Sequence, residues 1–395
     1  MPRRIRVVEL IYRFGIESQG GAGIGRFCTE LSRTLNKDRF EVAVCALGSL
    51  NTPFERDHIR LLNEEGIRAF PAAQWDEQKP YQSFWRAYQA LRSEFSTRPV
   101  DILHSHSEFT DIAALFLKFG SISQTILRTV HYGYRYEWRK RPLRRLILTN
   151  LLYPLFFNKE IGVSQSTMDN LNQRWLSQLM KRRASCIYNA ISLDRFAQVQ
   201  IDKAEKKRSL GLPPDALVIG SIGRLSEQKG YTNLIEAAAG VVIQMPRAYF
   251  LIVGEGDLAE ELKIQAQNSK AGSHILFTGP RSDVEELLAC MDLFVSPSLW
   301  EGLPTVIMES MASGIPVVAT DIPGTRELIQ HGITGWLTPP ASAQRLYETI
   351  LQALASPSGR ETAIRQSHKA VEKFSIQSVT RQYERLYLEA LPNFD

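Results

Sequence analysis

Two glutamates, Glu301 and Glu309, lie with seven residues between them, where an apolar run gives way to a helical pattern. Residues 293–295 predict a strand, and Pro304 suits the first position of the following helix, where its missing N–H costs no bond. A strand, a turn and a helix N-terminus form the anion-binding corner of an α/β sheet. There Glu309 can accept hydrogen bonds from a ribose diol, and Glu301 can reach a group beyond the phosphates. The pattern favours an enzyme that binds a nucleotide sugar.

The same spacing is also compatible with two solvated glutamates near a helix start, where acidic side chains are favoured. The residues that follow weaken this alternative. Gly314 is suited to end the helix, and residues 316–320 predict a buried parallel strand directly afterwards. The two acids would then lie at the carboxyl edge of one strand, where open sheets bind their ligands.

Arg224 and Lys229 lie on one glycine-rich segment, residues 220–230, between a predicted strand and a predicted helix. A guanidinium offers a planar fork to a phosphate, and an ammonium adds a compact charge. Together they can offset the charge that grows on a departing diphosphate. A solvated basic loop is the alternative, but the glutamate pair is expected one strand-end away in the same sheet.

The strongest competing signal is residues 253–259, Val-Gly-Glu-Gly-Asp-Leu-Ala, which match the Gly-x-Gly-x-x-Ala dinucleotide fingerprint of oxidoreductases. However, the next predicted strand, residues 275–279, does not end in the acidic residue that should bind the ribose. The glycines equally permit a tight turn and close packing of a helix on a strand. We therefore favour a structural role over a dinucleotide site.

No Asp-x-Asp pair stands at a predicted strand end, so the sequence offers no holder for a divalent ion on a diphosphate. His104 and His106 can present two imidazoles on one face of a strand end, but no third ligand is evident near them. We predict neither a metal site nor a resident cofactor.

The organisation of the chain indicates two domains. A length of 395 residues exceeds one ordinary core, and 44% hydrophobic with 23% charged residues is typical of soluble globular proteins. Apolar runs alternate with amphipathic helical patterns, which predicts parallel sheets covered on both faces. We expect an α/β fold of two doubly wound domains across a cleft, residues 1–195 and 196–375, with a C-terminal helix in 376–395 that packs back on the first domain. The expected strands are 5–11, 40–47, 102–104, 125–130, 160–163, 217–222, 248–253, 275–278, 293–296 and 316–320.

Charge is unevenly divided along the chain. Residues 1–195 hold 29 Lys and Arg against 19 Asp and Glu, whereas residues 196–395 hold 18 against 23, so the halves carry +10 and −5. The first half is therefore expected to meet something anionic. The four cysteines are far apart and form no CxxC pair, which fits a reduced cytoplasmic compartment.

The motifs described above resemble those of the retaining glycosyltransferases of family 4 (group 1), which have the GT-B fold of two Rossmann-like domains. The resemblance is most specific over residues 220–339, where the basic loop, the glycine turn 254–256, the segment 277–280, the glutamate pair and the segment 332–335 occur in family order. In the first half, residues 20–26 resemble the glycine loop near the donor phosphates. Gly23 takes the place of the second family glycine and Ala22 that of the first.

The resemblance implies a role for each charged residue of the second half. Arg224 and Lys229 would hold the diphosphate, Glu309 the ribose hydroxyls, and Glu301 the donor hexose. The donor would be a UDP- or GDP-sugar.

The resemblance also implies contacts made largely by the main chain. Amides near Leu303 and Thr305 would assist Glu301, and the base would lie near Arg281 to Val284. His131 resembles the family histidine beside the transferred sugar, although a hydrogen-bonded histidine at a strand end is the alternative. Attack would come from the front side, with the leaving diphosphate helping to take the acceptor's proton.

A basic and aromatic segment marks the first half. An apolar stretch, residues 146–157, follows it and is too short to span a bilayer. We predict that residues 128–157 meet an anionic membrane surface, which suits a lipid-linked acceptor. A nucleic acid partner is disfavoured because the donor site demands another substrate, and a solvated helix face stays open. The segment comprises Arg128, Arg135, Arg139, Lys140, Arg141, Arg144 and Arg145, with Tyr132, Tyr134, Tyr136 and Trp138.

The sequence thus predicts a cytoplasmic hexosyltransferase, peripheral on the inner face of the membrane, that takes part in cell-surface polysaccharide or glycolipid assembly. Two other classes stay open. One is a nucleotide-sugar epimerase or hydrolase on the same fold, and the other is a non-catalytic nucleotide-sugar binding protein.

Overall fold

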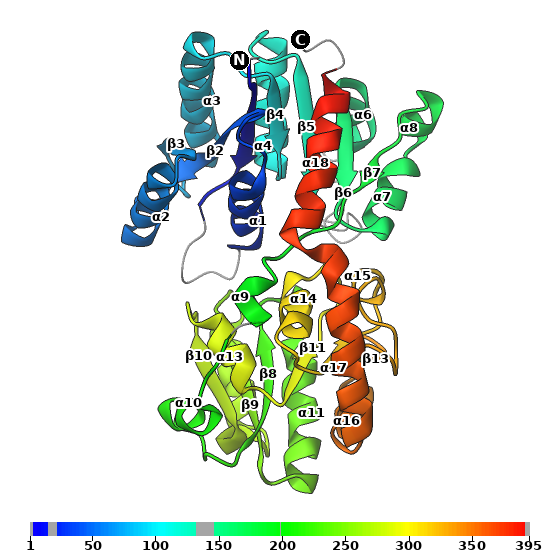
Figure 1. Ribbon diagram of the computed structural model, residues 1–395. Helices are drawn as coiled ribbons and strands as arrows, with labels where there is room; N and C mark the ends of the chain where they lie inside the picture. Colours follow the sequence, from blue (N-terminus) through cyan, green and yellow to red (C-terminus); the bar gives the residue numbers. More distant parts are fainter. Residues whose placement is uncertain (1–2, 15–21, 132–145, 198, 392–395) are drawn as a thin grey trace. The chain divides into compact units, whose positions relative to one another are not determined.

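The structure, a computed structural model, describes residues 3–14, 22–131, 146–197 and 199–391. These residues form two compact units, each a sheet flanked by helices (Figure 1). The first unit takes in the described residues up to Ala190 together with those from Ile376 onward, and the second runs from Ile191 to Ser375. The division falls a few residues before the expected boundary after residue 195.

The first unit is built on a seven-stranded parallel sheet in the order β3-β2-β1-β4-β5-β6-β7. The sequence order reverses between β1 and β4, which is the topological switch point of a doubly wound sheet. All residues of β4 and β5 are buried, as strands covered on both faces require. The strands are β1 (Ile5–Ile11), β2 (Phe40–Ser49), β3 (Arg68–Gln74), β4 (Ile102–Ser105), β5 (Thr125–Val130), β6 (Lys159–Gly162) and β7 (Ser185–Cys186).

Helix α18 (Ile376–Ala390) packs within the first unit although its residues end the chain. Val379, Tyr383 and Tyr387 share one face at helical spacing and are buried in the core that β1 and α1 (Ala22–Thr34) also form. The Oγ1 atoms of Thr34 and Thr380 lie 2.7 Å apart. The other helices of this unit are α2 (Pro53–Glu64), α3 (Pro80–Thr97), α4 (Glu108–Phe119), η2 (Leu148–Leu152), α6 (Tyr153–Phe156), α7 (Gln165–Asn172) and α8 (Trp175–Leu179).

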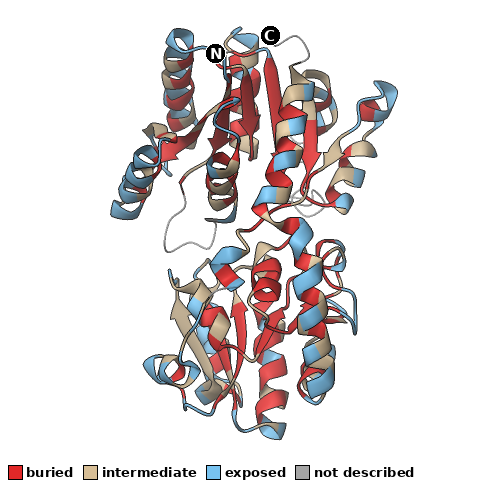
Figure 2. Cartoon of the chain, viewed as in Figure 1, coloured by how far each residue is buried: buried red, intermediate tan, exposed pale blue. Residues whose placement is uncertain are grey.

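The second unit has a six-stranded parallel sheet in the order β10-β9-β8-β11-β12-β13. Its order reverses between β8 and β11. Figure 2 shows that the central strands of both units are buried. The strands are β8 (Leu217–Ile222), β9 (Ala248–Val253), β10 (Ile275–Gly279), β11 (Leu293–Ser296), β12 (Val317–Thr320) and β13 (Trp336–Thr338).

The helices of the second unit connect these strands and cover the sheet. Glycine ends α14, as expected, because Gly314 follows it at φ +71°, a conformation that favours glycine. The helices are α9 (Asp194–Ala197), α10 (Lys203–Ser209), η3 (Glu227–Lys229), α11 (Tyr231–Gln244), α12 (Ala259–Gln267), η4 (Gly272–His274), α13 (Val284–Cys290), α14 (Thr305–Ala312), α15 (Pro323–Arg326), α16 (Ala343–Leu354), α17 (Pro357–Val371) and η5 (Glu372–Phe374).

Candidate functional site

The switch point of the second sheet gathers two of the loops that the sequence singled out. The loop after β8 carries Arg224 and Lys229, and the loop after β11 carries Glu301. Because β8 and β11 are neighbours and parallel, both loops leave the same edge of the sheet. Ligands bind outside the carboxyl ends of strands at such a point.

Lys229 and Glu301 form the central contact of this site. The Nζ of Lys229 lies 2.6 Å from Oε1 of Glu301, and the two side chains are 20% and 8% exposed. Glu301 also accepts hydrogen bonds from Ser298 Oγ at 2.8 Å and from Gln228 Nε2 at 3.2 Å. The carboxylate is therefore held in one orientation, with three donors around it.

Backbone contacts hold the two loops together. The amide of Leu299 donates to the carbonyl of Gln228 at 2.7 Å. Gly230 has φ +64°, and a Cβ there would lie 2.2 Å from the carbonyl oxygen of Pro297. Only glycine permits both the left-handed backbone and this close approach. Gly230 thus sets the distance between Lys229 and the loop of Glu301.

Helix α14 carries the second glutamate. The sequence predicted Pro304 as the first residue of this helix. The helix instead begins at Thr305, and Pro304 is the residue before it. Glu309 is buried on this helix, and Leu303 is buried just before it. The first amides of α14 have no acceptor carbonyl within the helix, so this N-terminus can bind an anion.

Arg224 stands apart from the Lys229–Glu301 pair. Its Nη2 lies 3.2 Å from Asp257 Oδ2, with side chains 50% and 79% exposed, so this ion pair is weak. Next to Asp257, the glycines of the dinucleotide-like segment serve packing. A Cβ at Gly254 would lie 2.1 Å from the carbonyl oxygen of Gly223, and one at Gly256 would lie 2.3 Å from that of Leu225.

Arg281 and Val284 follow β10, at the edge of the same sheet and two strands from β8. Arg281 Nη2 lies 2.7 Å from Asp283 Oδ2, and Lys206 Nζ lies 2.6 Å from the same oxygen. The hydrogen bond from Arg281, together with that from Lys206, holds the pKa of Asp283 well below its usual range. The loop that starts α13 at Val284 is therefore fixed by charged bonds.

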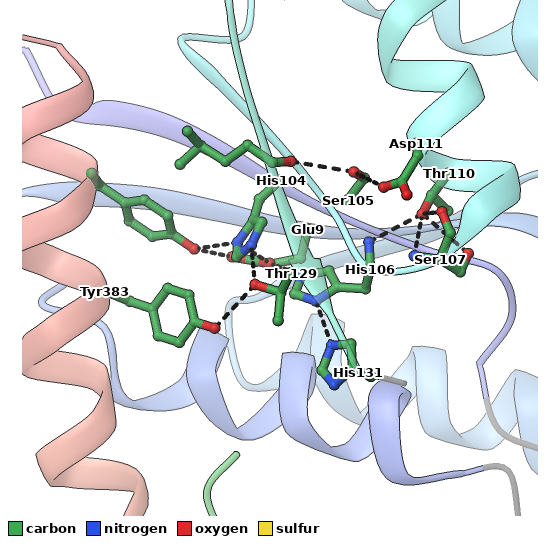
Figure 3. A network of polar contacts seen from close by, with 12 residues as sticks. Glu9, His104, Ser105, His106, Ser107, Thr110, Asp111, Thr129, His131 and Tyr383 are labelled. Atoms are coloured by element: carbon green, nitrogen blue, oxygen red, sulfur yellow. Dashed lines mark hydrogen bonds and ion pairs between the residues drawn. The ribbon is translucent and has the colours of Figure 1, made fainter. Parts of the chain in front are cut away.

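His131 belongs to the first unit and follows β5. It is buried, and its Nε2 lies 3.1 Å from Nδ1 of His106, which follows β4 (Figure 3). The Nε2 of His106 lies in turn 2.7 Å from Oε2 of Glu9 on β1. Burial, followed by the neighbouring His106 and His104, lowers the pKa of His131 well below its usual range.

Glu9 was not predicted from the sequence. It lies close to both His104 and His106, the two histidines for which the sequence showed no third ligand. Its Oε2 is 3.1 Å from Nδ1 of His104. Among the described residues, Glu9, Cys28 and His106 form the one group of three metal-capable side chains with donor atoms within 4.8 Å of one another. Burial raises the pKa of the Cys28 thiol well above its usual range, and a metal would need the thiolate. The hydrogen bonds already made by Glu9 and His106 favour a polar network instead. The signal in the sequence was a single acid inside the apolar strand Ile5–Ile11.

Two family profiles match the chain. The profile of glycosyl transferases group 1 covers residues 202–370, and that of glycosyltransferase family 4 covers residues 21–195. The chain is a group 1 glycosyltransferase of the family 4 type.

Curated relatives of this glycosyltransferase include two bacterial enzymes. The Escherichia coli UDP-Gal:alpha-D-GlcNAc-diphosphoundecaprenol alpha-1,3-galactosyltransferase is 27% identical over 330 residues, which are 80% of this chain and 81% of that protein. The lipopolysaccharide core biosynthesis glycosyltransferase LpsE of Rhizobium meliloti is 32% identical over 207 residues, 52% of this chain and 58% of that protein.

Solved structures match over nearly the whole chain. HepE of Anabaena, in complex with UDP and glucose, has a TM-score of 0.79 at 19% identity and covers 98% of this chain and 100% of its own. Sucrose-phosphate synthase of Thermosynechococcus elongatus has a TM-score of 0.80 at 21% identity, with the same coverages. At these identities the likeness establishes the fold, which is GT-B with two Rossmann-like domains.

The remaining expected site residue, Gly23, is the second residue of α1 in this glycosyltransferase. It is exposed, and a Cβ there would meet nothing within 4 Å. Its amide lies in the first turn of the helix, where amides have no acceptor within the helix. The glycines at 20 and 21 lie outside the described residues.

The basic segment of the first unit needs one correction. Arg128 is not part of an exposed patch, because it is buried between Asp111, at 2.8 Å, and Glu160, at 3.0 Å. The central strand β5 places this side chain in the interior. The basic and aromatic residues 132–145 lie outside the described residues. No helix in the described part of the chain combines the length and apolar character needed to cross a bilayer.

Proposed function

We propose that this glycosyltransferase moves a hexose from a UDP-sugar to a glycan or lipid-linked acceptor, with retention of anomeric configuration and without a metal ion. The observation that carries the proposal is the partly buried Lys229–Glu301 pair at the switch point of the second sheet. This pair lies on the loops that precede α11 and α14. A cation, an oriented carboxylate and a helix N-terminus suit a sugar diphosphate.

Each charged residue of the second unit has a role in this proposal. Lys229 bonds the diphosphate and shares its charge between the phosphate and Glu301. Arg224, which forms a weak exposed pair with Asp257, turns from this carboxylate to the phosphates. Glu309 accepts from the ribose hydroxyls, as its place on α14 allows.

The other contacts of the donor are assigned to the main chain and to the first unit. Amides near Leu303 and Thr305 bond the hexose that Glu301 orients. The base lies against the fixed loop from Arg281 to Val284. His131 meets the transferred sugar, and the leaving diphosphate helps to accept the proton of the attacking hydroxyl.

The choice of donor and acceptor is supported by the relatives. The E. coli relative is named for a UDP-Gal donor and a diphosphoundecaprenol-linked acceptor, and HepE was solved with UDP and glucose. LpsE is named for lipopolysaccharide core biosynthesis. We therefore assign this chain to the assembly of a cell-surface polysaccharide or glycolipid on the cytoplasmic side of the membrane.

A surface of the first unit suits a lipid-linked acceptor. Leu146, Ile147 and Leu151 are exposed at and before η2, and Trp175 and Leu179 are exposed on α8, an element in contact with η2. We call these five residues the apolar surface. Exposed Lys181, Arg182 and Arg183 follow α8 after one residue, Met180. Apolar side chains beside basic ones suit an anionic bilayer.

A donor screen tests the proposal. Calorimetry with UDP, GDP and their sugars should show binding of a UDP-sugar, unchanged by EDTA. A radiolabelled donor should then transfer its sugar to an undecaprenyl-diphosphate-linked acceptor, again in EDTA. Release of UDP at the same rate without acceptor would indicate a hydrolase or epimerase, and binding without turnover would indicate a binding protein. A strict requirement for Mg²⁺ or Mn²⁺ would contradict the metal-independent mechanism.

A further inference from the structure

Three buried side chains from three neighbouring strands form a line that ends at His131. Glu9 lies on β1, His106 directly follows β4, and His131 directly follows β5 (Figure 3). The Oε2 of Glu9 lies 2.7 Å from Nε2 of His106, and the Nδ1 of His106 lies 3.1 Å from Nε2 of His131. All three residues are buried, so the line is shielded from solvent.

The charge states along this line follow from burial and from the bonds. Although burial opposes ionisation, the bonds and charges of His104 and His106 hold the pKa of Glu9 well below its usual range. Burial, followed by the neighbouring His104, lowers the pKa of His106 to about 4, against the opposing effect of Glu9. At neutral pH the line therefore consists of a carboxylate and two neutral imidazoles.

These charge states assign each proton. An ionised carboxylate only accepts hydrogen bonds, so the Nε2 of His106 must carry the hydrogen that faces Glu9. A neutral imidazole has one N–H, and the Nδ1 of His106 must then accept. The hydrogen between the two histidines consequently belongs to Nε2 of His131, so the Nδ1 of His131 carries no proton and can only accept hydrogen bonds. Asn189 is a further hydrogen-bond partner of His131.

We propose that Glu9 and His106 are positioning residues that hold His131 in its Nε2–H tautomer, so that His131 Nδ1 accepts a hydrogen bond from a hydroxyl of the transferred sugar. The ligand in this inference rests on the proposed function. The tautomer itself rests only on contacts and charge states within the first unit. A carboxylate that orients a histidine through its second nitrogen is a general means of fixing a ring.

The other oxygen of Glu9 is held by the C-terminal helix. Tyr387 of α18 donates to Glu9 Oε1 at 2.7 Å and lies 2.8 Å from Nδ1 of His104. His104 Nε2 lies 2.8 Å from the hydroxyl of Thr129, which is 3.1 Å from the hydroxyl of Tyr383 (Figure 3). Because both oxygens of Glu9 have donors, the carboxylate cannot turn away from His106. Helix α18, which packs within the first unit, thus helps to hold Glu9 against His106.

A spectroscopic measurement tests the tautomer directly. The full chain, labelled with ¹⁵N-histidine and free of donor, is studied at pH 7.5 by long-range ¹H–¹⁵N correlation, with His106→Gln and His131→Gln variants to assign the signals. We expect both His106 and His131 to be neutral and protonated at Nε2. An Nδ1–H tautomer or an imidazolium at either residue would overturn the proposal.

A kinetic measurement tests the use of the tautomer. Glu9→Gln keeps the shape but removes the charge, and it should lower the kcat of sugar transfer about 10- to 100-fold, as expected for a residue that orients a functional histidine. The dissociation constant of UDP should stay within about twofold, since no sugar is present. The double variant Glu9→Gln/His131→Gln should have a kcat no lower than that of the slower single variant, because the two substitutions remove the same interaction with the sugar. Multiplying effects would show that Glu9 does not act through His131.

Two further variants keep this test decisive. Cys28→Ala changes a buried neighbour outside the line, and its kcat should stay within about twofold of the parent. If Glu9→Gln does not fold, Tyr387→Phe replaces it, because it removes one donor to Glu9 and keeps the ring; a kcat unchanged in that variant would contradict the proposal. A parent enzyme that transfers no sugar from any nucleotide donor would refute the proposed function, whereas the tautomer measurement would still decide the positioning of His131.

Discussion

The Nζ of Lys229 and the Oε1 of Glu301 lie 2.6 Å apart, although 72 positions separate the two residues in the sequence. The pair ties the loop after β8 to the loop after β11, the two strands between which the sheet order reverses. Lys229 therefore neutralises a mostly buried carboxylate before any diphosphate arrives. We expect Lys229 both to stabilise the fold and to bind the donor, and the effects on stability and on turnover can be measured separately.

Lys229→Met should lower both stability and turnover. Loss of the cation leaves Glu301 with only the neutral donors Ser298 and Gln228, which should cost about 1–3 kcal/mol of unfolding free energy. The double variant Lys229→Met/Glu301→Gln should recover most of that stability, because no buried charge is left, yet stay inactive. Urea unfolding and steady-state kinetics measure the two effects. A double variant as unstable as the single one would contradict this account of the pair.

Glu309→Gln should weaken the binding of UDP, since the proposed ribose contact is made before any chemistry. Loss of a charged acceptor should cost about 1.5–3 kcal/mol, or roughly a 10- to 150-fold rise in the dissociation constant. Titration calorimetry with UDP measures it. Glu348→Gln, on the exposed side of α16, is the matched control and should bind UDP like the parent. Unchanged affinity in Glu309→Gln would remove this residue from the ribose site.

Much of the fold could be predicted because its central strands are continuous apolar runs. The bounds expected for β1, β5, β8, β9 and β11 agree with the structure. The strands β3, β7 and β13 escaped prediction for physical reasons. Strand β3 is half-buried and contains Pro71, which cannot donate to a ladder, whereas β7 and β13 are too short to show a period.

The site could be predicted only where charges lie close to glycine and proline signals. Lys229 and Glu301 were expected at neighbouring strand ends, and the structure brings them into contact. Arg128 was assigned to a surface because charge usually means exposure, but Asp111 and Glu160, from other parts of the sequence, make a buried position tolerable. The partners of such a residue are set by sheet register, which a single sequence does not reveal.

The stability of the first unit should fall as the pH falls from about 6.5 to 4. Burial lowers the pKa of His106 from 6.5 to about 4, so the folded state binds its proton less readily than the unfolded state. The contribution of His106 to the free energy of unfolding is fully present above pH 6.5. Roughly 1–3 kcal/mol of it is lost as the pH falls from 6.5 to 4. The pKa of His131 is also lowered, so its contribution to stability is likewise lost as the pH falls. The pKa of Glu9 is lowered as well, but its contribution is lost only below about pH 4.5.

Urea unfolding at pH 7.5, 6.5, 5.5 and 4.5 measures this dependence. The groups that face His106 are Glu9, His104, His131 and the neutral Cys28 thiol, so the variant must leave these in place. His106→Gln should flatten the profile between pH 6.5 and 4.5. An equally steep profile in this variant would assign the pH dependence to another group.

Arg128→Met should destabilise the chain strongly. It removes the cation that lies between Asp111 and Glu160, both buried, and such a loss costs about 3–5 kcal/mol. Arg68→Met breaks a partly exposed pair with Glu94 in the same unit and should cost about 1 kcal/mol or less. Chemical denaturation compares the two. Equal losses would mean that Arg128 is not the buried centre of a charge cluster.

The last prediction concerns the membrane. If the apolar surface and the basic residues near it dock on a bilayer, sedimentation with vesicles should rise with the anionic lipid fraction and fall with salt. Changing Arg139, Lys140 and Arg141 together to Ser should abolish most of the binding, since each basic residue near the surface contributes about 1 kcal/mol. This triplet lies outside the described residues, so the test rests on the sequence alone.

A second variant tests the described part of the same surface. Leu146→Ser/Ile147→Ser removes two exposed apolar side chains and should weaken vesicle binding about tenfold or more, because each buried aliphatic side chain contributes about 1.5–3 kcal/mol. Ile243→Ser/Ile264→Ser is the matched control, since both residues are exposed and apolar but belong to the second unit. Binding of UDP should be unchanged in both, which shows that the donor site is intact. If the two pairs of substitutions weaken vesicle binding equally, or if the parent ignores anionic lipid, the surface does not dock on membranes, and the acceptor is presented in solution.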